Sequence, residues 1–192
     1  VLDKLIILNV AIFIVVTVLQ VVQKLFGFDL FNFNPYVAVS SNIEFFIFHL
    51  WTLFTYMFIH YEIFHILFNM LMLFWFGKMF LTYFTPKNFV ALYILGGIAG
   101  GLLYIISFNT IPYFIQQETS YLVGASASVT AIIFAAAFYN KNLEVRLLFF
   151  GSVKIIYIAI AIFLIDFISL KGDNNIGGHV AHIGGALIGY LY

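Results

Sequence analysis

Long apolar runs, several of them about 20 residues long, are the feature that most constrains the fold of this chain. Of the 192 residues, 64% are hydrophobic and only 8% are charged. Ordinary soluble domains are about 45–50% apolar and about 25% charged. A soluble domain of this size still exposes about 30% of the surface of its unfolded chain, so it could not hide this much apolar surface from water. The composition therefore predicts an all-α polytopic membrane protein.

Charge and cysteine content exclude several classes of function. Lys and Arg together number 8, as do Asp and Glu, so the chain has no basic field that would hold nucleic acid. Cysteine is absent, which excludes disulfides, a cysteine nucleophile and a thiolate metal site.

The number of membrane spans follows from length. A helix needs about 20 residues to cross about 30 Å of hydrocarbon, so six helices take about 120 residues and leave about 70 for loops. We predict a single membrane domain, residues 1–192, formed by a six-transmembrane-helix bundle. The predicted spans are Leu5–Phe26, Tyr61–Phe84, Phe89–Ile106, Ser126–Tyr139, Leu147–Leu170 and a sixth that begins near Gly178.

Two connections between these spans differ in kind. Residues 27–60 are too long and too aromatic for a simple loop, so we expect them to be structured. We predict that Asn109–Tyr121 forms a polar loop.

Basic residues give the predicted orientation. Most of them fall on one side of this topology, namely Lys4, Lys78, Lys87, Lys141, Arg146 and Lys154, whereas Lys24 and Lys171 fall on the other. The positive-inside rule then places both termini in the cytoplasm, and we expect a bacterial inner membrane. Because the chain starts without Met and stops inside an apolar run, we also expect trimmed termini.

Polar side chains at membrane depth are costly, so each is a functional hypothesis by default. His60, His65 and Asn69 surround the start of the second span, and His179 and His182 open the sixth. His65 and Asn69 share a helix face because they are four residues apart. The alternative for each is an interhelical hydrogen bond that only fixes packing.

The segment that begins with Gly124 opens the short fourth span. From Ser126 to Tyr139 there are 14 residues, about 21 Å of helix, so the helix starts below the membrane surface. Ser126 would lie at the submerged N-terminus, where free N–H groups and the helix dipole favour a developing anion. The alternative is that Ser126 only caps the helix.

One face of the sixth span combines a histidine with glycines that permit close contact with a neighbouring helix. His182, Gly185 and Gly189 fall at i, i+3 and i+7, and the glycines permit close helix contact. If that neighbour is the fourth span, His182 can accept the proton of the Ser126 hydroxyl. We then expect the serine oxygen and a ring nitrogen about 2.6–3.2 Å apart, or somewhat more without substrate. His65, Asn69 and the Ser126 backbone N–H could stabilise the oxyanion.

Three separated motifs together resemble the rhomboid family of intramembrane serine proteases. They are His60-Tyr-Glu-Ile-Phe-His65-Ile-Leu-Phe-Asn69, Gly124-Ala-Ser126, and Ala181-His182-Ile-Gly-Gly185 followed by Gly189. The order, the spacing and the six-span layout cover nearly the whole chain.

The resemblance implies an intramembrane serine endopeptidase. Ser126 would be the nucleophile and His182 the base of a dyad without an acid, while His65 and Asn69 help to form the oxyanion hole. His60, Gly124, Gly185 and Gly189 would support them. The reaction would cleave peptide bonds in or near transmembrane segments of membrane-protein substrates. The expected partners are those substrates and membrane lipid; neither a cofactor nor a metal is implied.

Three positions depart from the family pattern. Trp51-Thr52 stands where the family has Trp-Arg, so the role of the arginine is unfilled. Thr130 replaces an aromatic residue that often packs on the catalytic histidine, so His182 would be held less firmly. Ala127 follows the serine where many members have glycine.

Two further residues compete for catalytic roles. We interpret Asp166, near the outer end of the fifth span, as an interfacial carboxylate that reaches water or caps the next loop. Ser128 lies about 200° around the helix from Ser126, so both serines cannot face His182.

Three other functions remain open. A membrane metalloenzyme could use His60, His65, His179 and His182 as ligands, but the chain lacks HExxH and this reading leaves Ser126 without a role. The hypothesis of a transporter is weakened because the sequence has no detectable inverted repeat. A non-catalytic rhomboid-like protein that binds transmembrane clients would not need both Ser126 and His182.

Overall fold

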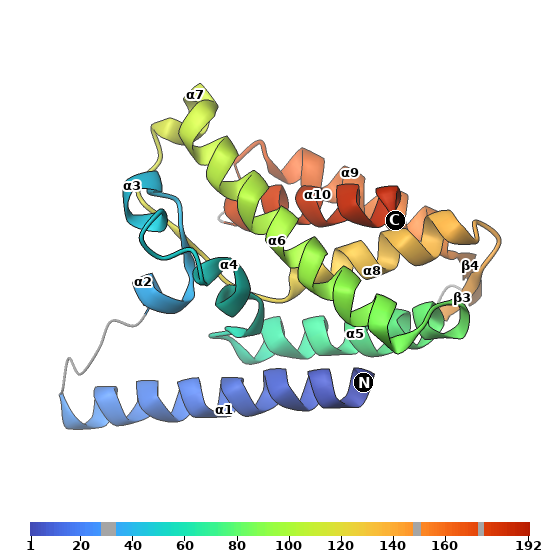
Figure 1. Ribbon diagram of the computed structural model, residues 1–192, viewed down its shortest axis with the longest axis horizontal. Helices are drawn as coiled ribbons and strands as arrows, with labels where there is room; N and C mark the ends of the chain where they lie inside the picture. The colour runs from blue at the N-terminus through green and yellow to red at the C-terminus, as the bar shows by residue number, and fades with distance from the viewer. Residues whose placement is uncertain (28–33, 148–150, 173–174) are drawn as a thin grey trace.

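The computed structural model describes residues 1–27, 34–147, 151–172 and 175–192, and it is a helical bundle (Figure 1). Helices α1 (Leu2–Phe26), α5 (Ile63–Tyr83) and α6 (Pro86–Thr110) are long and apolar enough to cross a membrane. Helices α8 (Ser126–Tyr139), α9 (Ile155–Ser169) and α10 (Ile176–Leu191) are apolar but shorter. These elements confirm the predicted all-α membrane bundle, and the count of six spans stays a prediction.

The fifth predicted span begins later than we expected. Strands β3 (Glu144–Leu147) and β4 (Gly151–Lys154) form an antiparallel hairpin, so the prediction of a helix from Leu147 was wrong. Gly151, the first residue of β4, has a φ of +69°, a conformation that a helix does not accept. The helix α9 starts only after this hairpin.

The connection after α6 also contains helix. The helix α6 continues to Thr110, and a short helix α7 (Pro112–Ile115) follows it. Proline at the first helical position favours this start because its missing N–H has no intrahelical partner to lose. The prediction of a plain polar loop over Asn109–Tyr121 was therefore wrong for its first half.

The long first connection is structured, as predicted for the part that is described. It contains α2 (Asn34–Val37), β1 (Val39–Ser40), α3 (Ile43–Phe46), α4 (Thr52–Thr55) and the 3₁₀ helix η1 (Tyr56–Phe58). Strand β1 pairs antiparallel with β2 (Tyr121–Leu122), which joins this connection to the segment that leads into α8. The first half of the chain thereby fixes the entry to the fourth span.

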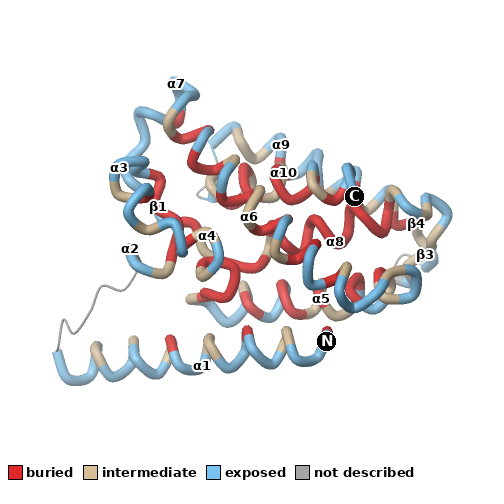
Figure 2. Tube along the Cα trace, in the orientation of Figure 1, coloured by how far each residue is buried: buried red, intermediate tan, exposed pale blue. Residues whose placement is uncertain are grey.

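The core of the molecule is α8, which lies between α6 and α10 and is buried along nearly its whole length (Figure 2). Glycines on both neighbours permit this close packing. A Cβ atom at Gly185 of α10 would overlap the carbonyl oxygen of Ala127, and one at Gly100 of α6 would lie 2.5 Å from the Ala127 Cβ. Small residues at helix contacts are typical of membrane bundles, where close van der Waals packing drives association.

Apolar side chains cover the outside of the molecule. Figure 2 shows α1 exposed along most of its length, and its large hydrophobic residues include Ile7, Ile14, Val18 and Leu25, each about half exposed or more. Such a continuous apolar surface is stable in lipid and not in water. The chain is therefore an integral membrane protein.

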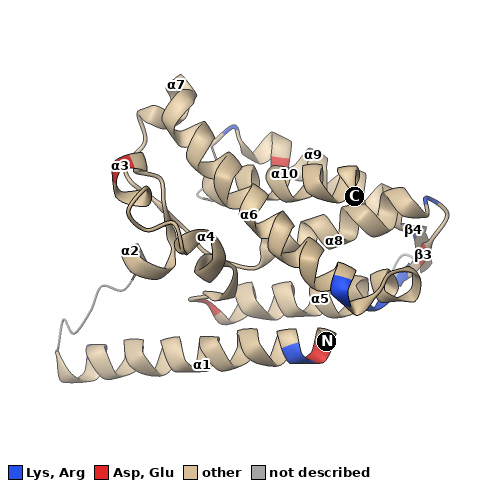
Figure 3. Cartoon of the chain, viewed as in Figure 1, with Lys and Arg blue, Asp and Glu red and all other residues tan. Residues whose placement is uncertain are grey.

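The two termini and the α5–α6 turn lie at one end of the bundle together with the β3–β4 hairpin (Figure 1). A hydrogen bond from the Asn88 amide to the Tyr192 hydroxyl joins two of these parts, and Asn140 Nδ2 donates to the Tyr83 hydroxyl at 3.2 Å. Most of the Lys and Arg residues lie at this end (Figure 3). The predicted one-sided distribution of basic residues is confirmed, and the side of the membrane that this end faces stays a prediction.

Candidate active site

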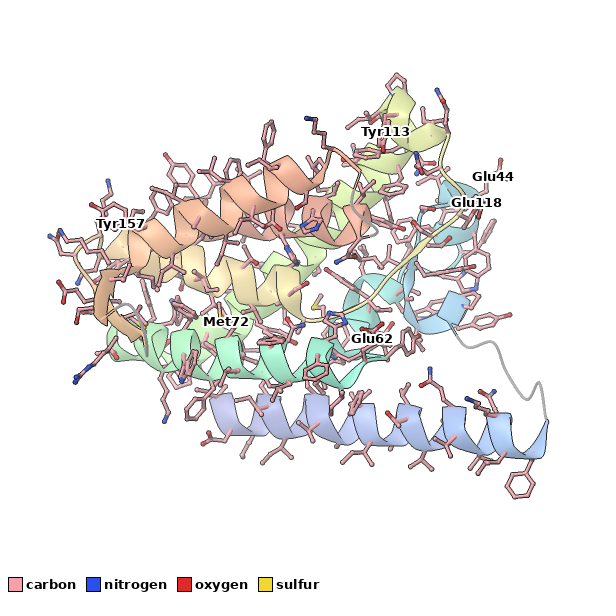
Figure 4. The ribbon with its side chains drawn as sticks, turned by 180° about the vertical axis from the view of Figure 1, so that it is seen from behind. Glu44, Glu62, Met72, Tyr113, Glu118 and Tyr157 are labelled. Carbon is pink, nitrogen blue, oxygen red and sulfur yellow. The ribbon has the colours of Figure 1, made fainter. Side chains whose placement is uncertain are left out.

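A cavity of about 500 Å³ opens between α5, α8, α9 and α10. Most of the residues that we predicted to be polar at membrane depth line it, namely His65, Asn69, Ser126, His179 and His182. Asp166, which we placed at the interface, lines the same cavity. Glu62 and Met72, labelled in Figure 4, line the α5 side of the same cavity. Residues from distant parts of the chain thus meet in one hollow of the bundle.

Ser126 is the first residue of α8, and the turn before it is held by two hydrogen bonds. The Gly124 N–H donates to the Tyr56 carbonyl at 2.9 Å, and the Ala125 N–H donates to His60 Nε2 at 3.3 Å. Both acceptors belong to the segment just before α5. These bonds fix the position at which the serine enters the cavity.

The role of Gly124 follows from its backbone and its neighbour. Its φ is +113°, which side chains other than hydrogen rarely accept, and a Cβ there would lie 2.6 Å from His65 Nε2. Glycine therefore lets the His65 ring approach the turn before Ser126.

His60 is completely buried, and its ring lies edge-on to His65 with 4.9 Å between the ring centroids. Burial, and secondarily the neighbouring His65, lowers the pKa of His60 to about 4. The ring is therefore neutral near pH 7, as it must be for Nε2 to accept the Ala125 N–H. His60 supports the serine turn and does not line the cavity.

Asn69 lies one turn after His65 on α5, and both line the cavity. One proton of the Asn69 amide is donated to the His65 carbonyl at 2.9 Å. The second proton of that amide can serve another acceptor, because a primary amide carries two. The predicted sharing of one helix face by His65 and Asn69 is confirmed.

The predicted contact between the fourth and sixth spans is also confirmed. Gly185 packs on the Ala127 carbonyl and Gly189 on the Ala131 carbonyl, so α10 lies directly against α8. This contact brings His182 to the cavity that Ser126 lines.

Asp166 is the residue whose role we predicted wrongly. It is 4% exposed, and its Oδ1 accepts hydrogen bonds from Nδ1 of His182 at 2.8 Å and Nδ1 of His179 at 2.7 Å. It is not an interfacial carboxylate that reaches water, because α9 packs against α10 and directs it at the two histidines. One sequence signal could have found it, since a lone carboxylate in an otherwise apolar helix needs a buried partner.

Ser126 and His182 line the same cavity without a direct hydrogen bond between them in the described part of the chain. A contact of about 2.6–3.2 Å is therefore not formed here, while the looser approach that we expected without substrate stays a prediction. Because Nδ1 of His182 is engaged by Asp166, Nε2 is the nitrogen that remains for the serine. Catalytic hydrogen bonds are often long without substrate and shorten when substrate binds.

Ser128, the competing serine, points away from the cavity. Its side chain is fully buried, and a Cβ at Gly97 of α6 would lie 2.7 Å from its Oγ. The predicted separation of Ser126 and Ser128 on the helix is confirmed. Thr130, at the position where an aromatic residue was expected on the histidine, lines the cavity instead.

The first connection holds its shape without an arginine after Trp51. The Thr52 hydroxyl is buried and donates to the His49 carbonyl at 2.7 Å. Trp51 Nε1 donates to the Tyr36 carbonyl at 2.8 Å. Local side-chain to backbone hydrogen bonds thus stabilise this segment.

The histidines do not assemble as the four-ligand metal site that we considered. His60 bonds to the Ala125 N–H, whereas His179 and His182 meet at Asp166. Among the residues that the structure describes, one group brings three potential metal-ligand atoms within 4.8 Å of one another, and it consists of Asp166, His179 and His182.

Comparison with known proteins identifies the family. Residues 48–192 match the family model described as the Rhomboid domain. The chain belongs to the rhomboid family. It is 30% identical over 147 residues to the RHOMBOID-like protein 12, mitochondrial, of Arabidopsis thaliana, an alignment that covers 71% of this chain and 44% of that relative. This rhomboid chain therefore spans less than half the length of that relative.

Proposed function

We propose that this rhomboid is an intramembrane serine endopeptidase that cleaves peptide bonds in or near the transmembrane segments of membrane proteins. The observation that carries the proposal is the single cavity that Ser126, His182, His65 and Asn69 line. Family membership supports the same chemistry. Neither a metal nor a cofactor takes part in the proposed reaction.

In the proposed mechanism, Nε2 of His182 accepts the proton of Ser126 as Oγ attacks the scissile carbonyl carbon. The carbonyl oxygen becomes an oxyanion that accepts hydrogen bonds from the Ser126 N–H, the second Asn69 amide proton and His65. His182 then gives its proton to the leaving amine as the peptide bond breaks. Water then gives a proton to Nε2 of His182 as it attacks the acyl carbon, and His182 returns that proton to Ser126 Oγ as the ester bond breaks.

We propose that Asp166 positions His182. The catalytic unit would then consist of Ser126, His182 and Asp166, and not of the predicted dyad without an acid. The hydrogen bond of Asp166 at 2.8 Å keeps the proton of His182 on Nδ1 and leaves the lone pair of Nε2 for Ser126. It also restrains the ring, which Thr130 does not cover with an aromatic face. The proposal thus revises the catalytic unit that the sequence predicted.

The proposed substrates are single transmembrane segments that enter from the lipid. The apolar surface of the bundle supports lipid as the surroundings in which they meet the cavity. A bacterial inner membrane with both termini in the cytoplasm stays our proposal for the setting, while the name of the plant relative assigns that relative to mitochondria.

The test is cleavage in lipid vesicles. The protein is reconstituted with a fluorescent single-span peptide that carries small residues followed by helix-breaking residues within its membrane segment. The wild type should cleave it, and Ser126→Ala should not, whereas Ser128→Ala should retain cleavage if it folds. Cleavage by Ser126→Ala would overturn the proposal.

A second candidate function is a non-catalytic rhomboid that binds transmembrane clients. The missing hydrogen bond between Ser126 and His182 is the observation that favours it. Binding of the same peptide by wild type and Ser126→Ala, without cleavage by either, would support this second function.

A further inference from the structure

We propose that Asp166, His179 and His182 form a binding site for a divalent transition-metal ion such as Zn²⁺, and that the bound ion blocks the base. Metal binding, the first half of the proposal, concerns the three ligands alone. Inhibition, the second half, rests on the proposed function, because it concerns His182 as the partner of Ser126.

The three ligand atoms are already gathered. Oδ1 of Asp166 lies 2.7 Å from Nδ1 of His179 and 2.8 Å from Nδ1 of His182. The histidines are three residues apart, one turn of α10, and the carboxylate comes from α9. Two imidazoles and one carboxylate with an open fourth position are a frequent ligand set for zinc.

Two of the three separations between ligand atoms are already close to those at a zinc ion, and all three lie within 4.8 Å. Zinc bonds to nitrogen and oxygen are about 2.0–2.1 Å, so tetrahedral ligand atoms stand about 3.3 Å apart. Each Nδ1 to Oδ1 separation would lengthen by about 0.6 Å as the metal displaces the two N–H protons. The adjoining cavity can supply water as the fourth ligand.

The charge around Asp166 also favours a cation. The carboxylate is 4% exposed, and the described residues that line the cavity include no Lys or Arg. Among the described residues, Asp166 bonds to two imidazoles and to no Lys or Arg, and a buried carboxylate is costly at low dielectric unless a cation lies beside it. A divalent ion would compensate that charge.

A metal at this site excludes the proposed role of His182. A neutral imidazole has one lone pair, and a metal on Nδ1 takes it while the proton moves to Nε2. Nε2 then cannot accept the proton of Ser126. Bound metal should therefore inhibit peptide cleavage reversibly, and a chelator should restore it.

The binding test uses Co²⁺ as a spectroscopic substitute for Zn²⁺, on the full chain in detergent without a polyhistidine tag. We expect one Co²⁺ per chain with the visible absorption of a four-coordinate ion, and displacement of Co²⁺ by Zn²⁺. Losing a second-shell partner already lowers metal affinity about 10–100-fold, so Asp166→Asn and His179→Ala, which lose a ligand, should lower it about 100-fold or more.

Two controls separate this proposal from the proposed function. Ser126→Ala should bind Co²⁺ like the wild type even though it lacks cleavage activity. His49→Gln, which removes a histidine outside the cavity, should also bind Co²⁺ like the wild type. If wild type gives no such absorption, or if it persists in His179→Ala and Asp166→Asn, the metal site is wrong. If Co²⁺ binds as described but Zn²⁺ leaves the cleavage rate of the wild type unchanged, the inhibitory half is wrong.

Discussion

At the scale of single residues, the proposed mechanism depends on which nitrogen of His182 carries the proton. Asp166 decides this, because a carboxylate oxygen can only accept and therefore holds the proton on Nδ1. A carboxamide at the same position can present an N–H to Nδ1 instead, which would favour the wrong tautomer.

Asp166→Asn should therefore lower kcat about 10²–10⁴-fold, the range that general acid–base catalysis contributes. KM should stay close to the wild-type value, because Asp166 does not contact the substrate in the proposed mechanism. The measurement is steady-state cleavage of the single-span peptide with chelator present, beside a thermal melt of each protein. An unchanged kcat in a folded variant would mean that Ser126 and His182 act without Asp166.

His60 gives the molecule a pH-dependent stability. Its pKa is about 4 in the folded protein and about 6.5 when exposed, so the unfolded chain binds more protons between these values. The contribution of His60 to the free energy of unfolding is fully present above about pH 6.5. It is lost as the pH falls toward 4, by up to about 3 kcal/mol.

Melting temperatures of the wild type and His60→Gln, measured in detergent at pH 7.5 and pH 5, test this. Glutamine can still accept the Ala125 N–H but does not titrate. The variant should lose less stability between the two pH values than the wild type does. Equal losses would show that His60 is not the titrating group.

At the scale of elements, α8 is positioned by backbone contact with α10. Gly185 and Gly189 bring the α10 backbone onto the carbonyls of Ala127 and Ala131. The i, i+3, i+7 stripe predicted this face because the small residues that permit such contact are visible in the sequence. The same stripe could not reveal Asp166, whose partner depends on the register between α9 and α10.

Gly185→Ala tests this contact. The added methyl meets a backbone carbonyl that cannot rotate away, and overpacking of this kind costs about 1–3 kcal/mol. We expect the melting temperature in detergent to fall by roughly 3–10 °C and cleavage to fall with it. Leu187→Ala, on the exposed side of the same helix, should change both much less.

The boundaries of elements show what a sequence pattern can and cannot predict. The limits of α8 were predicted correctly because small residues open it and Asn140 ends it. The β3–β4 hairpin was missed because its apolar residues continue into α9 and hide the change of period. Strand β1 was not predicted either, since its partner Tyr121–Leu122 lies about 80 residues away.

At the scale of the whole molecule, the distribution of charge predicts the orientation. Most Lys and Arg residues gather at the end that carries both termini (Figure 3), and such an end faces the cytoplasm by the positive-inside rule. The opposite end carries α7 (Figure 1). The cavity would then open toward the outer side of the membrane.

The absence of cysteine makes this orientation directly measurable. Asn142→Cys introduces a thiol in the turn between α8 and β3, and Gln116→Cys introduces one after α7, both at exposed positions and without change of charge. In intact bacterial cells an impermeant maleimide should label Gln116→Cys and not Asn142→Cys. The opposite pattern would reverse the predicted topology.

The central claim is that His182 activates Ser126 within one cavity, and covalent labelling tests it most directly. The purified protein is treated with a fluorophosphonate, and the modified peptide is identified by mass spectrometry in wild type, Ser126→Ala and His182→Ala. The account predicts a single adduct on Ser126 that is strongly reduced when His182 is replaced. An adduct that persists in Ser126→Ala, or undiminished labelling of Ser126 in His182→Ala, would contradict it.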